Sequence, residues 1–120
     1  MVNEDRVTLS HGAGGKKTSS LINEILKRYF ENELFTDDDG AILPASGSKK
    51  LVVSTDGFIV SPSFFPGGDI GKLSVCGTVN DISCMGAKPL YLTCSFVIEE
   101  GFSMDKLEEI VAAMEKTANE

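Results

Sequence analysis

The spacing of hydrophobic residues changes along the chain, and each change predicts a new element. Residues 6–10 alternate polar and apolar side chains, which predicts a short strand. After Thr18 the apolar residues recur at helical spacing and predict an amphipathic helix that fades between residues 32 and 35. Its apolar face consists of Ile22, Ile25, Leu26, Tyr29 and Phe30. Thr18 or Ser19 is placed to cap this helix, because short hydroxyl side chains accept bonds from the first free N–H groups.

Runs rich in β-forming residues predict the main strands. Residues 51–55 indicate a buried strand that continues past Asp56 into residues 58–60. Residues 41–43 predict a shorter strand. Residues 90–98 give the clearest strand, with an apolar face and a semi-polar face that could meet a partner.

Two more helices are predicted in the second half of the chain. Asp69 stands at the N-cap position of a helix over 70–85, and Gly86 is placed to end it. Apolar residues surround this helix, which predicts burial on all sides. The preceding residues 64–69 predict a tight turn that buries two phenylalanines. Ser103 caps a last helix, whose apolar stripe is Leu107, Ile110, Val111 and Met114.

The predicted order is strand, helix, strands, helix, strand, helix. This order favours an α+β fold, with helices on one face of a mixed or antiparallel sheet. A chain of 120 residues has the length of one domain, so we expect residues 1–120 to form a single unit. The sequence stops in or just after a helix, as an excised domain would.

Charge and cysteine content limit the classes of partner and compartment. Eighteen acidic against eleven basic residues give a net charge of −7, which argues against nucleic acid and anionic membranes as partners. No run approaches the roughly 18 apolar residues of a membrane span, and the N-terminus lacks a secretory signal, so we expect a cytoplasmic protein. The odd set of cysteines predicts buried thiols and no disulfide framework: Cys76, Cys84 and Cys94.

A glycine-rich turn between the first strand and the first helix is a candidate anion site. His11, Gly12, Gly14 and Gly15 form its core, and glycines allow backbone N–H groups to converge on a phosphate. The standard phosphate-loop pattern requires Ser or Thr where Lys17 stands. A flexible connecting turn is the alternative interpretation.

Three aspartates form a second candidate site. Asp56 follows a buried strand, Asp81 lies inside the apolar helix, and Asp39 lies in an acidic turn. Carboxylates without histidine or thiolate neighbours suit Mg²⁺, which prefers oxygen ligands and often bridges to phosphates. The alternatives are a turn residue for Asp56 and a salt bridge or surface charge for Asp81.

Seven short motifs then occur in one order along the chain. They are His11–Gly15, Asp38–Ala41, Ser54–Gly57, Phe64–Gly71, Gly77–Ile82, Met85–Pro89 and Glu99–Phe102. In this order they resemble the HypE family of hydrogenase maturation proteins, within the aminoimidazole ribonucleotide synthetase superfamily.

The resemblance implies an N-terminal domain that pairs its sheet with that of a second copy in a homodimer. It also implies an enzyme that uses ATP and Mg²⁺ to dehydrate a carbamoyl group on its own C-terminal cysteine. The resulting thiocyanate supplies the cyanide ligand of nickel–iron hydrogenase. The implied partners are a carbamoyltransferase, which donates the carbamoyl group, and an iron-carrying scaffold, which accepts the cyanide.

Residue by residue, the resemblance matches Asp56 and Asp81 to the acids that hold metal and nucleotide, and Asp39 to a third acid. It implies that Asn80 assists Asp81 and that residues 11–15 lie near the phosphates. The C-terminal domain and its cysteine are absent from this sequence, so we expect the chain alone to lack the full reaction. The alternatives are a homodimerisation module, another ATP-using member of the superfamily, or a small-molecule-binding domain without catalysis.

Overall fold

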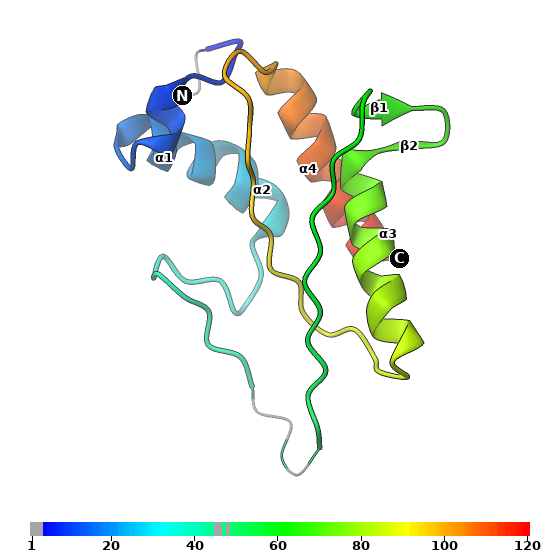
Figure 1. Ribbon diagram of the computed structural model, residues 1–120. Helices are drawn as coiled ribbons and strands as arrows, with labels where there is room; N and C mark the ends of the chain where they lie inside the picture. Colours follow the sequence, from blue (N-terminus) through cyan, green and yellow to red (C-terminus); the bar gives the residue numbers. More distant parts are fainter. Residues whose placement is uncertain (1–3, 45–46, 48) are drawn as a thin grey trace.

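Helices supply most of the regular structure in the computed structural model, which describes residues 4–44, 47 and 49–120 (Figure 1). A 3₁₀ turn, η1, precedes a helical run of three parts, and two long helices follow after a small hairpin. In order, the elements are η1 (Leu9–Gly12), α1 (Lys16–Leu21), the π-helical η2 (Ile22–Leu26), α2 (Lys27–Phe30), β1 (Phe64–Phe65), β2 (Gly68–Asp69), α3 (Ile70–Cys84) and α4 (Met104–Ala118). Helices with a two-stranded antiparallel sheet confirm the α+β class. In the part of the chain described, no helix is both long and apolar enough to cross a membrane.

The first helix is confirmed, but the strand predicted before it is wrong. The helical run starts at Lys16 with Gly15 as its N-cap and ends at Phe30, before the predicted 32–35. Residues 9–12 form the turn η1, and Arg6 makes a single antiparallel bridge to Ser103. The alternating pattern of this short segment was overridden by local bonds that close the turn.

Both later helices are confirmed together with their caps. The Asp69 carboxylate accepts a hydrogen bond from the Lys72 N–H at 2.9 Å and so begins α3. Gly86 lies just beyond the end of α3 with φ of 72°, a conformation that glycine adopts without strain. The Ser103 hydroxyl accepts from the Lys106 N–H at 3.4 Å and begins α4.

The main core lies where α4 meets the N-terminal helical run. Val111 of α4 is fully buried. The buried cluster consists of Val7, Leu21, Ile25, Met104, Leu107 and Val111, with Phe96, Ile98 and Phe102 packed against it. Two hydrogen bonds also join α2 to α4. Arg28 Nη1 and Tyr29 Oη donate to Glu108 Oε1 at 2.9 and 2.8 Å.

Helix α3 packs against α4 along one side only. Gly71 and Val75 are its buried residues, whereas Leu73 is 38% exposed and Met85 is 69% exposed. The prediction of a helix buried on all sides is therefore wrong for this chain, and so is the prediction of buried thiols, because all three cysteines are exposed. The sequence pattern marks faces that prefer burial, and part of this apolar surface stays exposed in the described residues.

The strands predicted at 41–43, 51–60 and 90–98 are not paired into a sheet. The sheet in the described part of the chain is the β1–β2 hairpin, in which Phe64 pairs with Asp69 and Phe65 with Gly68. The predicted tight turn is present, but the predicted burial of its two phenylalanines is wrong, because both are only half-buried. Residues 51–60 and 90–98 run as long non-helical segments (Figure 1). Ile59 and Val97 are fully exposed within them. A β-strand requires hydrogen bonds to a neighbouring strand. Segments 51–60 and 90–98 have the composition of strands but lack such a neighbour among the described residues.

Candidate functional site

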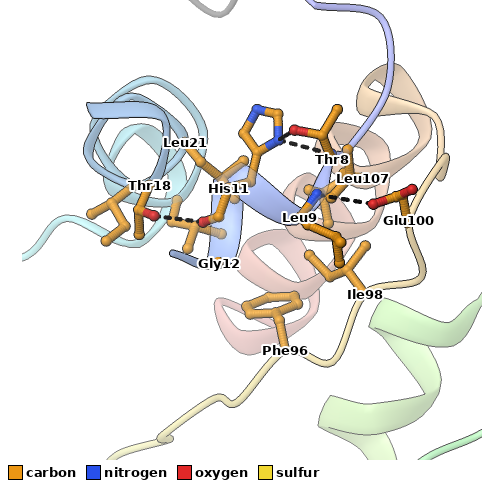
Figure 2. Close-up of a pocket in the computed structure, with 13 residues that line it drawn as sticks. Thr8, Leu9, His11, Gly12, Thr18, Leu21, Phe96, Ile98, Glu100 and Leu107 are labelled. Atoms are coloured by element: carbon orange, nitrogen blue, oxygen red, sulfur yellow. Dashed lines mark hydrogen bonds between the residues drawn. The ribbon is translucent and has the colours of Figure 1, made fainter. Parts of the chain in front are cut away.

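The glycine turn is an ordered structure closed at its first end by a buried histidine. His11 is 6% exposed, and its Nδ1 accepts a hydrogen bond from the Thr8 N–H at 2.9 Å. The Thr8 hydroxyl lies 3.1 Å from the same nitrogen, and the His11 N–H donates to the Thr8 carbonyl at 3.0 Å. Figure 2 shows the ring directed toward Thr8. This closure explains why η1 replaces the predicted strand.

Thr18, which the sequence predicts as a helix cap, closes the other end of the turn. The Thr18 hydroxyl accepts from the Gly14 N–H at 2.9 Å and donates to the His11 carbonyl at 2.7 Å. Gly14 has φ of 80°, which favours glycine at that position. The predicted capping role of Thr18 or Ser19 is therefore wrong, because Gly15 is the N-cap of α1. A connecting turn without a ligand stays the alternative to an anion site. A hydroxyl residue shortly after the last glycine was the signal available in the sequence.

Charged groups gather beside the turn. The Lys17 ammonium pairs with the Glu4 carboxylate, and this hydrogen bond lowers the pKa of Glu4 below its ordinary value. Glu4 Oε2 lies 3.7 Å from His11 Nε2 and is a buried oxygen without a hydrogen-bond partner. Lys16 is exposed at the start of α1. Sequence reasoning missed Glu4, because a single acid before the first element carries no pattern.

A cavity of about 350 Å³ lies under the turn. His11, Gly12 and Thr18 form part of its wall, and apolar side chains from distant segments complete it (Figure 2). The apolar part includes Leu21, Leu26, Phe96, Ile98 and Leu107. The turn thus rests on the edge of the main core, which fixes its position relative to α4.

A second and larger hollow, about 530 Å³, lies between segments 54–60 and 92–99 and the helices α3 and α4. Asp56 lines this groove, is exposed, and accepts a bond from the Gly57 N–H at 2.8 Å. Cys94 also lines it. The residue as a whole is exposed, but the groove wall partly shields its thiol from water, and this desolvation raises the pKa of the thiol.

The remaining predicted residues lie outside the walls of this groove. Asp81 is half-buried on α3, one helical turn beyond the groove-lining Thr78, and Asn80 beside it is exposed. Asp39 is exposed in the bend over 37–40. Across residues 4–44, 47 and 49–120, no group of three or more His, Cys, Asp or Glu side chains is arranged to hold a metal ion. One copy of this chain therefore does not gather Asp39, Asp56 and Asp81 into a complete metal centre.

The fold and the glycine turn define an α+β domain whose helices follow a candidate phosphate loop and flank a groove with an acidic residue. Residues 37–120 match the family model described as AIR synthase related protein, N-terminal domain, and the chain belongs to this family.

Individual relatives within this family are more specific. The chain is 46% identical to a protein named carbamoyl dehydratase HypE from Cupriavidus necator, over 99% of this chain and 34% of the relative. It is 48% identical to the protein of the same name from Bradyrhizobium diazoefficiens, over 95% of this chain and 33% of the relative. The predicted resemblance to the HypE family is confirmed.

A solved structure agrees with these relatives. The crystal structure of hydrogenase maturation protein HypE in complex with ATP superposes on this chain with a TM-score of 0.88 and 49% identity. The match covers 93% of this chain and 33% of that structure. The chain thus spans about a third of the length of the relatives it matches.

Proposed function

We propose that this chain is the N-terminal, nucleotide-binding domain of a carbamoyl dehydratase that serves hydrogenase maturation. The observation that carries the proposal is the likeness to HypE in complex with ATP, with a TM-score of 0.88 at 49% identity. Residues 1–120 as a single domain and a cytoplasmic location stay predictions from the sequence.

The proposed nucleotide site combines the glycine turn with the acids. Residues His11, Gly12 and Gly15 would lie near the phosphates, while the Gly14 N–H is already bonded to Thr18. Mg²⁺ would be held by Asp56 and Asp81, with Asn80 assisting and Asp39 as a third acid. All these side chains offer oxygen donors, which suits Mg²⁺.

The described acidic residues of one copy are too few at any one place and too far apart to supply all the ligands of a Mg²⁺ ion. Because no group of three acidic, histidine or cysteine side chains forms in the described part, phosphate oxygens or a second copy would complete the coordination. Bound Mg²⁺ would neutralise the polyphosphate, which allows a protein with a net charge of −7 to hold ATP.

Calorimetry with Mg-ATP on the full-length protein tests this site. We expect Asp56→Asn and Asp81→Asn each to weaken binding by at least about tenfold, because each removes a negative oxygen ligand. Glu109→Gln, an exposed acid on α4, is the matched control and should bind as the wild type does. Unchanged affinity in both aspartate variants would remove the proposed metal site.

The proposed reaction requires residues outside this chain. ATP would transfer its terminal phosphoryl group to the carbamoyl oxygen of a thiocarbamate on a C-terminal cysteine and release ADP. Loss of that oxygen as phosphate, together with the two protons of the carbamoyl nitrogen, would then leave a thiocyanate. A carbamoyltransferase would supply the carbamoyl group and an iron-carrying scaffold would accept the cyanide. A turnover assay on the full-length protein separates this enzyme from a binding domain without catalysis, since only the enzyme forms ADP as the carbamoyl group is consumed.

A specific observation favours self-association as a second role. A compact monomer of 12.8 kDa exposes about 6,300 Å², whereas this chain exposes 8995 Å². The surplus of about 2,700 Å² is comparable to one partner's share of an obligate interface. Segments 51–60 and 90–98 contribute exposed apolar residues to it, among them Leu51, Val53, Ile59, Leu90 and Val97. We infer that a second copy covers these segments in a homodimer.

Sedimentation of the full-length protein tests the dimer. Ile59→Lys and Val97→Lys change side chains that are fully exposed in one copy, so they should leave the fold of that copy intact and yield monomers. Ala118→Lys, at the exposed end of α4, is the control and should remain dimeric. Dimers of unchanged affinity in both the Ile59 and the Val97 variant would show that another region forms the contact.

A further inference from the structure

We propose that His11 and Thr18 are positioning residues that set the shape of the glycine turn for nucleotide binding. The inference rests on the proposed function, since it assigns the turn to the phosphates. It adds two side chains that act on the turn through the backbone and need not touch the ligand.

The histidine anchors the entrance of the turn through an acceptor nitrogen. A backbone N–H can only donate, so the bond from Thr8 N–H to His11 Nδ1 requires an unprotonated Nδ1 and places the ring proton on Nε2. The ring is 6% exposed and its backbone N–H bonds back to the Thr8 carbonyl. The two bonds between Thr8 and His11 fix the direction in which the chain enters the glycines.

The threonine bridges the turn from inside the helix. One hydroxyl accepts from the Gly14 N–H and donates to the His11 carbonyl, at 2.9 and 2.7 Å. A hydroxyl group can do both at once, whereas a methyl group can do neither. The bridge holds Gly14 at its φ of 80° and ties it to the residue that the imidazole anchors.

Both sets of hydrogen bonds involve residue 11. The His11 carbonyl accepts a hydrogen bond from the Thr18 hydroxyl, and the His11 imidazole accepts one from the Thr8 N–H. His11 and Thr18 also line the cavity under the turn, whose wall further on includes Phe96 and Ile98 (Figure 2). The turn held by these two residues therefore lies at the edge of the core. Without them the phosphate would have to order the glycines on binding, which costs affinity.

Matched variants of the full-length protein test the role of Thr18. Thr18→Val keeps the shape and loses the hydroxyl, and it should weaken Mg-ATP binding by about five- to tenfold. Thr18→Ser restores the hydroxyl and should bind within about twofold of the wild type. Thr117→Val is the control, because the Thr117 hydroxyl also donates to a carbonyl, that of Ala113, but lies at the far end of α4. Equal affinity for Thr18→Val and wild type, or an equal loss in Thr117→Val, overturns the proposal.

Histidine variants and a ligand-free measurement separate this inference from the proposed function. His11→Asn retains an acceptor near the Nδ1 position and should bind more tightly than His11→Leu, which has none. Hydrogen exchange without nucleotide should show the Gly14 amide exchanging at least about tenfold faster in Thr18→Val than in Thr18→Ser. If the wild type binds no ATP, the proposed function fails. If exchange at Gly14 is the same in both variants, the positioning role fails whatever the protein binds.

Discussion

The carbonyl oxygen of Ile110 on α4 lies so close to Gly71 on α3 that a Cβ on residue 71 would come within 2.4 Å of it. Backbone atoms of a packed helix cannot move aside as a side chain can. The first turn of α3 therefore approaches α4 at a distance that only glycine permits.

Gly71→Ala should destabilise the protein by about 1–3 kcal/mol, because the two helices must separate to admit the methyl group. Denaturant unfolding of the variant measures this loss. Gly40→Ala is the control, since a Cβ there meets nothing within 4 Å. A stability equal to wild type in Gly71→Ala would mean that α3 and α4 are spaced more widely than described.

A second glycine contact links α3 to the extended segment 51–60. A Cβ on Gly77 would lie 2.6 Å from Cζ of Phe58, the far end of a side chain that can rotate. Gly77→Ala should lower the free energy of unfolding by about 1 kcal/mol, because the new methyl group displaces the Phe58 ring. In a Phe58→Leu background the same substitution should lower it by much less, because the ring is no longer there. A double-mutant cycle of unfolding free energies measures the coupling, and strictly additive effects would contradict the contact.

The tyrosine that joins α2 to α4 gives the domain a dependence on alkaline pH. The hydrogen bond that its hydroxyl donates to Glu108 raises the pKa of Tyr29 above its ordinary value of 10.0. The unfolded chain then loses the proton first, so the stabilisation is complete below about pH 10 and is lost as the pH rises through the folded value. Tyr29→Phe should therefore be less stable than wild type at neutral pH, with a gap that narrows above about pH 10.

Unfolding curves between about pH 8 and pH 11 test this, and Tyr91→Phe, on the exposed segment 90–98, serves as the control. A gap between Tyr29→Phe and wild type that stays constant over this range would show that the bond to Glu108 contributes nothing in solution.

Thiol reactivity should distinguish the three cysteines. Partial burial in the groove raises the pKa of Cys94, so it forms less thiolate at neutral pH. Cys76 and Cys84 are exposed on α3, and we expect iodoacetamide to modify them before Cys94. Mass spectrometry of the digested protein gives the three rates. Fastest modification at Cys94 would be inconsistent with the groove.

The sequence predicted the three main helical regions and the caps of the two long helices, but not the short turn η1. Asp69 and Ser103 cap the helices that they were expected to cap, and Gly86 follows the end of α3 with a positive φ. Caps and helical periodicity depend on residues a few positions apart, so they can be recognised from one sequence.

Elements that depend on distant partners were less predictable. Residues 51–60 and 90–98 have strand composition, but pairing requires neighbours that the pattern does not name. Likewise, the apolar face of α3 and the thiols of Cys76 and Cys84 prefer burial without specifying what buries them. The glycine turn was located correctly, whereas its closure by His11 and Thr18 depends on side-chain geometry that spacing alone does not reveal.

The long unpaired segments have a consequence for how such a protein must be made. Among the described residues, segments 51–60 and 90–98 carry unpaired backbone N–H and C=O groups and the exposed side chains of Ile59 and Val97. Such segments can pair with extended segments of other unfolded chains. In the cell, the interval between synthesis and assembly would then decide between the correct complex and aggregates. Low temperature and dilution would therefore favour recovery of the folded domain, because both slow the association of unfolded chains through segments 51–60 and 90–98.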